Sequence, residues 1–190
     1  MVVAIDGPAG VGKSTLAQWV SDKYGLLNLN SGAFYRAMVV KVLDDGVDAN
    51  DPEAVAAAAK DAEIDLIEGR IHLNGRDIED RLRTDHVDQW SSIISTIVPV
   101  RHVVNEHLRR VAGTTDLVAE GRDMTTIVFP DAEVKIFLDA DSAVRAKRRL
   151  DQGTSDMTLE ELGNSIRERD RRDRNKSFGA LRVAEDAVVV

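Results

Sequence analysis

A glycine-rich segment near the N-terminus has the residue types and the spacing of a phosphate-binding loop. It reads Gly7-Pro8-Ala9-Gly10-Val11-Gly12-Lys13-Ser14 and matches G-x4-G-K-[ST] at every fixed position. Glycines here let consecutive backbone N–H groups point at one phosphate, and the positive end of the following helix strengthens the attraction. Lys13 would reach the β- and γ-phosphates of a nucleotide, and the Ser14 hydroxyl would ligate Mg²⁺. A flexible glycine turn is the alternative, and the motif's place between a strand and a helix favours phosphate binding.

A second cluster of charged residues lies near the C-terminus, in the stretch 167–176. On a helix one face would hold Arg169, Arg172, Asp173 and Lys176, and the opposite face would hold Arg167, Arg171 and Arg174. Arginine is suited to bidentate phosphate recognition, so the cluster favours a second phosphorylated substrate. The alternative is a solvated face of local salt bridges, which is the usual role of such charge runs. The guanine-reading Asn-Lys-x-Asp box is absent, because Ser177 and Phe178 follow Asn175-Lys176.

Alternating strand and helix signals surround these residues. Short apolar runs at 2–5, 26–29, 116–120, 134–138 and 187–190 predict strands. Helices are predicted at 13–24, from 31, at 142–150 and from 158 to about 175, with Ser31 as an N-cap and Thr158-Leu159-Glu160-Glu161 as a capping box. This order predicts an α/β fold, with a five-stranded parallel sheet flanked by helices.

The stretch from about 44 to 95 has a different pattern. A helix at 53–60 leads into alternating segments at 63–67 and 70–73, and Asn74-Gly75 is a hairpin signal. We expect a small antiparallel insert in a single domain of 190 residues, whose core is 1–43 and 96–190, with a short lid at about 151–157.

The sequence as a whole resembles the bacterial cytidylate (CMP/dCMP) kinase family, which belongs to the nucleoside monophosphate kinases of the P-loop class. The resemblance spans essentially the whole chain and rests on five segments in order: 7–15, Asn30-Ser31-Gly32-Ala33-Phe34-Tyr35-Arg36, Gly121-Arg122-Asp123-Met124, 128–140, and Arg169-Asp170-Arg171-Arg172-Asp173-Arg174-Asn175. It implies a P-loop NTPase fold with a nucleoside-monophosphate-binding insert. It also implies transfer of phosphate from ATP, with Mg²⁺, to CMP or dCMP.

The resemblance also assigns residues to the site. The ATP contacts expected from the glycine-rich motif are Gly7, Pro8, Ala9, Gly10, Val11, Gly12, Lys13, Ser14 and Thr15, with Ser14 on the metal, and Arg149 of the arginine-rich helix is a further candidate. The acceptor contacts would be Ser31, Arg36, Arg122 and Asp123 at the phosphate, Ser92, Arg101 and Lys176 at the base, and Arg169 and Asp173 at the sugar. The catalytic set would be Lys13, Arg122, Asp123 and Arg169.

The sequence departs from the family pattern at three places. Lys176 stands where many members have an arginine, and a lysine lacks the planar fork that recognises a base edge. Thr125 replaces a glycine that is common after Gly-Arg-Asp-x. The sequence also ends at its last predicted strand, before the terminal helix that the family usually carries, which favours a shortened chain.

Several single residues have two interpretations from sequence alone. The helical set Arg145, Arg148 and Arg149 could bind the donor phosphates or form a solvated face. Glu120 could hold a water of Mg²⁺ or be structural. The histidines, at 72, 86, 102 and 107, lack metal-site spacing, and we expect Trp19 and Trp90 in the core.

Composition excludes several classes of protein. The net charge of −8 disfavours binding to a nucleic-acid polymer, and the eight aromatic residues are too few for a base-stacking platform. The absence of cysteine excludes disulfides and cysteine-ligated metals. No apolar run reaches the ~18 residues that a membrane span needs, and no basic segment precedes the first strand. We therefore expect a cytoplasmic monomer whose partners are small nucleotides.

Two alternatives remain from the sequence alone. One is a kinase for another small acceptor, such as UMP or shikimate. The other is a regulatory module that binds ATP without turnover, which leaves the second arginine cluster unexplained. An ADP-release assay across several acceptors would separate these.

Overall fold

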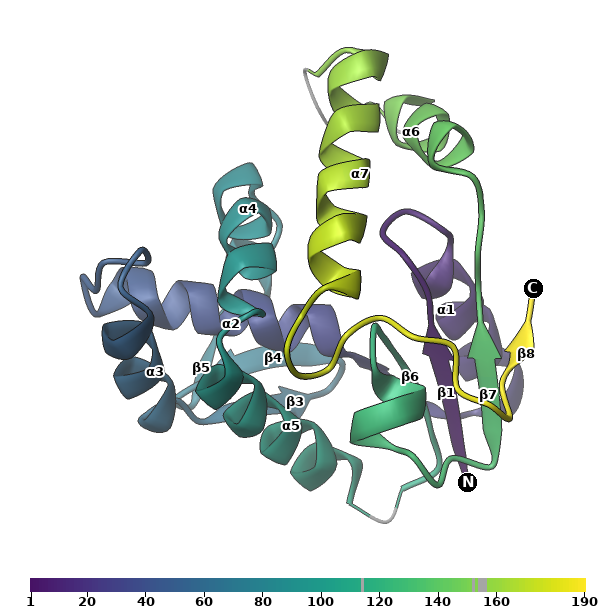
Figure 1. Ribbon diagram of the computed structural model, residues 1–190. Helices are drawn as coiled ribbons and strands as arrows, with labels where there is room; N and C mark the ends of the chain where they lie inside the picture. The colour runs from purple at the N-terminus through teal and green to yellow at the C-terminus, as the bar shows by residue number, and fades with distance from the viewer. Residues whose placement is uncertain (114, 152, 154–156) are drawn as a thin grey trace. The chain divides into compact units, whose positions relative to one another are not determined.

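A computed structural model describes residues 1–113, 115–151, 153 and 157–190 (Figure 1). The chain divides into two compact units: Met1–Leu27 with Asp116–Val190, and Asn28–Thr115. The stretch 44–95, expected as an insert, lies within the second unit, which also contains the helices on either side of it. Among the described residues, no helix is both long and apolar enough to span a bilayer.

The first unit is built on a parallel sheet with the strand order β2-β6-β1-β7-β8. The strands are β1 (Val2–Asp6), β2 (Leu27–Asn30), β6 (Leu117–Gly121), β7 (Val134–Phe137) and β8 (Val188–Val189). β1 is central and pairs in parallel with β6 on one side and β7 on the other. β2 spans the boundary between the two units. The five-stranded parallel sheet expected from sequence is confirmed.

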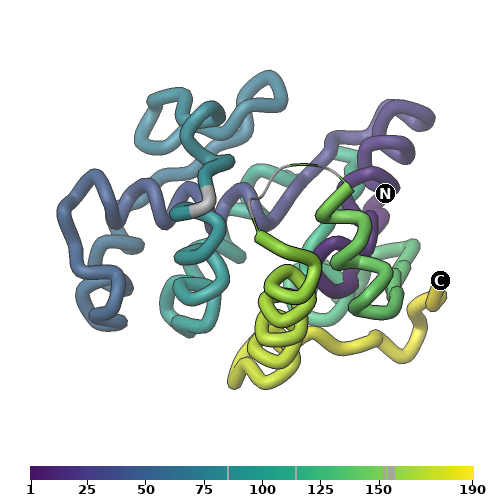
Figure 2. Tube along the Cα trace, turned by 90° about the horizontal axis from the view of Figure 1, so that it is seen from above, coloured from purple at the N-terminus to yellow at the C-terminus, as the bar shows by residue number. Residues whose placement is uncertain are grey.

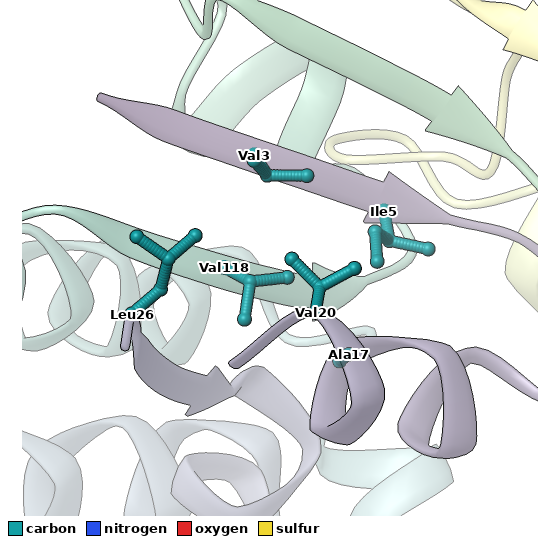
Figure 3. Close-up of a cluster of buried hydrophobic side chains, with 6 residues drawn as sticks. All are labelled: Val3, Ile5, Ala17, Val20, Leu26 and Val118. Carbon is teal, nitrogen blue, oxygen red and sulfur yellow. The ribbon is translucent and has the colours of Figure 1, made fainter. Parts of the chain in front are cut away.

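Helix α1 (Lys13–Tyr24) covers one face of this sheet. Figure 3 shows Ala17 and Val20 of α1 facing Val3 and Ile5 of β1, in a cluster that also contains Leu26 and Val118. Ala17 and Val20 lie three residues apart on the same side of α1. The burial of this cluster supplies the apolar area that holds the helix to the sheet. The helix ends at Gly25, whose φ of 67° is the left-handed conformation of a C-cap glycine.

Trp19 is not a core residue, and that expectation was wrong. Its residue surface is 53% exposed, and the Lys23 ammonium lies 4.5 Å from the centre of its ring. The buried face of α1 is formed by Ala17 and Val20, and Trp19 is exposed beside the Lys23 side chain one turn later. Trp90, in the second unit, is partly buried and donates its indole N–H to His86.

Helices α6 (Ser142–Asp151) and α7 (Leu159–Arg174) lie side by side (Figure 1, Figure 2). Ala146, Leu162 and Ile166 form their buried contact. The capping box predicted at the start of α7 is confirmed: Thr158 and Glu161 each bond the other's backbone N–H. Most of the expected lid at 151–157 falls outside the described residues.

The second unit combines helices with a three-stranded antiparallel sheet. Its elements are α2 (Ser31–Asp44), α3 (Pro52–Lys60), β3 (Ile64–Ile67), β4 (Arg70–Leu73), β5 (Arg76–Asp77), a short 3₁₀ turn (Glu79–Arg81), α4 (Asp85–Ile94) and α5 (Val98–Ala112). The turns at Glu68-Gly69 and Asn74-Gly75 have positive φ at both residues, as two-residue hairpins require. The predicted antiparallel meander is therefore confirmed.

The cap of α2 differs from the sequence expectation. Asn30, not Ser31, is the N-cap, and its side chain accepts from the Ala33 N–H. Ser31 is the first residue of the helix and is buried. Both residue types are good caps, so composition alone could not separate them.

Candidate active site

The glycine-rich loop joins β1 to α1 and has backbone angles that only glycine adopts without strain. The φ angles of Gly7, Gly10 and Gly12 are 152°, 73° and 110°. A Cβ built on Gly7 would lie 2.3 Å from the carbonyl oxygen of Leu138, directly after β7. Gly7 is thus required both by its φ and by its close approach to the neighbouring chain.

Lys13 begins α1 and its ammonium is enclosed by the loop. Its Nζ donates to the carbonyl oxygens of Gly7 and Pro8, at 2.8 Å each. Burial lowers the pKa of Lys13 well below its ordinary value and Arg122 adds to this, while Glu120 and Asp6 oppose it. The two carbonyl oxygens thus hold the Lys13 amine inside the loop, in a setting where charge interactions are strong.

The start of α1 is suited to an anion. Gly12 is the N-cap, no side chain caps the first turn, and that turn holds no acidic residue. The first N–H groups of a helix lack intrahelical partners and carry a partial positive charge. Ser14 and Thr15 follow directly and are exposed. The donor set therefore fits a nucleotide phosphate.

Asp173 of α7 lies in a buried group of charges. Its carboxylate oxygens accept from Arg122 Nε at 2.7 Å and from Lys176 Nζ at 2.8 Å. Burial alone would raise the pKa of Asp173, but Arg122, Lys176 and Arg169 together hold it well below the ordinary value. Helical spacing predicted Arg169 and Lys176 beside Asp173 on one helix face. Lys176 does contact Asp173, but it lies after α7, which ends at Arg174. The ion pair with Arg122 could not be predicted from spacing.

The two faces predicted for α7 differ in their environment. Asp173 is buried, and Arg169, Arg172 and Lys176 are partly buried. On the other face Arg167 donates to Asn164, and Arg171 pairs with Glu168 at 3.0 Å on the surface. The outer face therefore matches the alternative given for the charged stretch 167–176, a solvated face of local salt bridges.

Arg145 of α6 does not lie on a solvated face. Only 3% of its surface is exposed, and its guanidinium donates to the carbonyl oxygens of Ala140 and Ala9 and to the Asp170 carboxylate. Ala9 belongs to the glycine-rich loop and Asp170 to α7, so Arg145 links the loop to both helices. Arg148 donates more weakly to Val11 at 3.4 Å, and Arg149 is partly buried.

The acceptor residues expected between 28 and 115 lie within the second unit. Arg36 of α2 pairs with Asp88 of α4 through Nε at 2.7 Å. Arg101 of α5 is 1% exposed, donates to the Ser95 carbonyl oxygen, and lies 5.4 Å from the centre of the Tyr35 ring. Tyr35 and Asp88 were not assigned from sequence.

The other expected acceptor residues of this unit are two serines. Ser31 and Ser92 are both buried. Among the described residues, no three side chains of the His, Cys, Asp and Glu types gather as metal ligands. That the four histidines are not metal ligands stays a prediction. Glu120 is buried at the end of β6.

A parallel sheet whose central strand runs through such a loop into a helix is the architecture of the P-loop class of nucleotide-binding proteins. Comparison with known proteins gives the family. A family model described as "Cytidylate kinase" matches residues 3–190. The chain is 41% identical to the cytidylate kinase of Aeromonas salmonicida, over all of this chain and 85% of that protein. It is 43% identical to that of Methylococcus capsulatus, over all of this chain and 88% of that protein. The chain belongs to the cytidylate kinase family.

A further relative is a fused protein. The bifunctional pantoate ligase/cytidylate kinase of Trichormus variabilis is 41% identical over 98% of this chain, which corresponds to 37% of that protein.

Proposed function

We propose that this protein transfers the γ-phosphoryl group of ATP to CMP or dCMP, forming ADP and CDP or dCDP. The observation that carries the proposal is the enclosed Lys13 at the uncapped start of α1, in a chain that matches the cytidylate kinase family from residue 3 to residue 190. In the reaction, a phosphate oxygen of the acceptor forms a bond to the γ-phosphorus. The bond from that phosphorus to the β,γ-bridging oxygen breaks, so ADP leaves with the electron pair.

The roles proposed on the donor side follow from the loop. Backbone N–H groups between Gly7 and Thr15 hold the phosphates, apart from Pro8, which has no N–H. Lys13 neutralises charge that develops on the transferring group. Arg149 is the proposed further donor contact. Mg²⁺, when bound, neutralises phosphate charge, and the exposed Ser14 hydroxyl is the protein ligand that fits it, because Mg²⁺ takes most of its oxygens from phosphates and water.

The roles on the acceptor side are proposed separately for each unit. In the first unit Arg122, Asp123 and Arg169 are the contacts at the acceptor phosphate and the transferring group, and Asp173 is the contact at the sugar. Lys176 is the proposed base contact, although its ammonium bonds Asp173. In the second unit Ser31 and Arg36 are assigned to the acceptor phosphate, and Ser92 and Arg101 to the base. Placement and charge neutralisation account for the catalysis, with no covalent intermediate. We further propose that the protein acts as a cytoplasmic monomer on small nucleotides, not on a nucleic-acid polymer.

ADP release with MgATP tests the proposal against a panel of CMP, dCMP, UMP, AMP and shikimate. We expect turnover with CMP and dCMP. Lys13→Ala should lower kcat/KM by roughly a hundredfold or more, because one phosphate-clamping cation is lost. Its folding should be retained, since Lys13 lies at the junction of the loop and α1 and not in the apolar core, and circular dichroism checks this. Turnover only with UMP or shikimate would change the acceptor. No turnover with any acceptor, with ATP still bound, would indicate a regulatory module.

A further inference from the structure

Asp6, at the end of the central strand β1, bonds a turn that follows β6. Its carboxylate accepts from the backbone N–H groups of Met124 and Thr125, at 2.9 and 2.8 Å. The Thr125 hydroxyl donates to the same carboxylate at 2.6 Å. Both Asp6 and Thr125 are almost completely buried. Three short bonds therefore hold this turn to the end of β1.

The turn is unusual in its backbone. Residues Met124–Val128 form a π-helical turn, in which Val128 N–H bonds the Asp123 carbonyl oxygen. Such turns are rare and are frequent at functional sites, because they displace the neighbouring residues from regular positions. Arg122 and Asp123 lie directly before it, between the end of β6 and the turn. Their position depends on where the turn is held.

The same carboxylate stands next to the glycine-rich loop, since Gly7 follows Asp6. Two proposed parts of the site, the loop and the Arg122-Asp123 segment, thus meet at one buried side chain. We propose that Thr125 is a positioning residue for phosphoryl transfer, whose hydroxyl bond to Asp6 holds the Arg122-Asp123 segment at the start of the glycine-rich loop. This inference rests on the proposed function, because the segment it positions is assigned to the acceptor phosphate.

The charge state of Asp6 is what the hydroxyl influences. Burial raises the pKa of Asp6, and Asp123 raises it further, while the Thr125 hydroxyl and the two N–H groups lower it. Two further charged groups lie near Asp6. Lys13 interacts with it, and Glu120 of β6 pairs with Ile5, the residue before Asp6. Removing the hydroxyl removes one contribution that favours the carboxylate. Asp6 would then take up a proton at a higher pH and lose its role as a triple acceptor.

Three variants test this. Thr125→Val keeps the shape and removes the hydroxyl, and Thr125→Ser restores a hydroxyl. Thr126→Val is the matched control, because the Thr126 hydroxyl is buried in the same turn and has no hydrogen-bond partner among the described residues. If Thr125→Val does not fold, Thr125→Ala replaces it. The readouts are kcat and KM for CMP across pH, the melting temperature, and the Asp6 carboxyl titration followed by NMR.

We expect Thr125→Val to lower kcat/KM on the order of tenfold and to move the acid limb of the pH profile upward by about one unit. Thr125→Ser should restore both, and Thr126→Val should match the wild type. The substrate phosphate titrates at the same pH with every variant, so a difference between their acid limbs is assigned to the protein. The Asp6 titration should move upward in Thr125→Val.

Other outcomes overturn the proposal. An unchanged acid limb and Asp6 titration in Thr125→Val, with only a lower melting temperature, would make Thr125 a structural residue. Equal shifts in Thr125→Val and Thr126→Val would assign the effect to the turn as a whole. Because the Asp6 titration needs no turnover, an enzyme inactive on every acceptor would contradict the proposed function separately from the Asp6 contact.

Discussion

At the scale of single residues, Asp173 is the side chain whose charge matters most to the fold around it. It is buried, and Arg122 and Lys176 both donate to it, so removing its charge takes a carboxylate partner from two cations. Removing one partner of a buried ion pair lowers the stability of the fold, because the remaining charge stays desolvated. The bonded carboxylate is therefore a structural requirement as well as a proposed sugar contact.

Asp173→Asn should lower the free energy of unfolding by about 3–5 kcal/mol at pH 7. The pKa of Asp173 in the folded protein lies below its ordinary value of 3.8, so its stabilisation is present above that pH and is lost as the pH falls through the folded pKa. The difference between wild type and variant should therefore shrink below about pH 4. Urea unfolding at pH 7, 5, 4 and 3 measures this.

Asp186→Asn is the control for that series. Asp186 pairs with Lys135, but its side chain is 65% exposed, so the variant should change stability little at any of these pH values. Equal losses in the two variants, or a loss in Asp173→Asn that does not depend on pH, would contradict the importance of the buried group.

Side-chain partners at this scale were the least predictable feature. Helical spacing correctly predicted Arg169 and Asp173 together on α7, because neighbours at i+4 follow from the helix itself. Lys176 also contacts Asp173, but it lies after the end of α7. The contact of Arg122 with Asp173 joins residues 51 positions apart, and Arg145 with Asp170 joins residues 25 apart. Contacts of this kind depend on tertiary packing, which no local pattern encodes.

At the scale of elements, the positions of the glycines determine the backbone conformation of the loop between β1 and α1. The sequence predicted the loop and its following helix correctly, because both have strong local signals: the fixed glycine spacing and the C-cap Gly25. It predicted the wrong face of α1 for Trp19, because aromatic size suggests burial while the contact surface of the sheet selects Ala17 and Val20. The helices α4 and α5 were not assigned at all.

Gly7→Ala should disrupt the loop. The added Cβ would meet the Leu138 carbonyl oxygen at 2.3 Å, so the loop and β7 would have to separate. We expect kcat/KM for ATP to fall by roughly a hundredfold or more and the melting temperature to fall as well. Steady-state kinetics and thermal unfolding measure the two effects.

Gly25→Ala is the comparison for this variant. Gly25 also has a positive φ, of 67°, but a Cβ there meets nothing within 4 Å. It should cost about 1 kcal/mol of stability and leave turnover unchanged. If Gly7→Ala behaved like Gly25→Ala, the close approach at Leu138 would have no part in the function.

At the scale of the whole molecule, the two units differ in how their segments are joined along the chain. The second unit is continuous, and its strands β3 and β4 pair across a two-residue turn. The first unit is discontinuous: Val2 pairs with Leu117, and 88 residues of the second unit separate its two segments. Pairing of residues far apart in sequence is entropically costly and slows folding.

We therefore expect the second unit to gain structure first during refolding. Trp19 lies in the first unit and Trp90 in the second, so Trp90→Phe and Trp19→Phe leave one reporter in each. Stopped-flow fluorescence after urea dilution should show the Trp90 signal changing before the Trp19 signal. A Trp19 signal that is complete before that of Trp90 would contradict this order.

The central position of β1 has a consequence during synthesis on the ribosome. Its neighbours in the sheet, β6 and β7, begin at residues 117 and 134, so the apolar stretch Val2-Val3-Ala4-Ile5 emerges long before either partner is translated. At about 5–20 residues per second, that interval is roughly 6–20 s. An unpaired apolar strand is prone to pair with other chains. The nascent protein should therefore depend on a holding chaperone over this interval, with release governed by the emergence of β6.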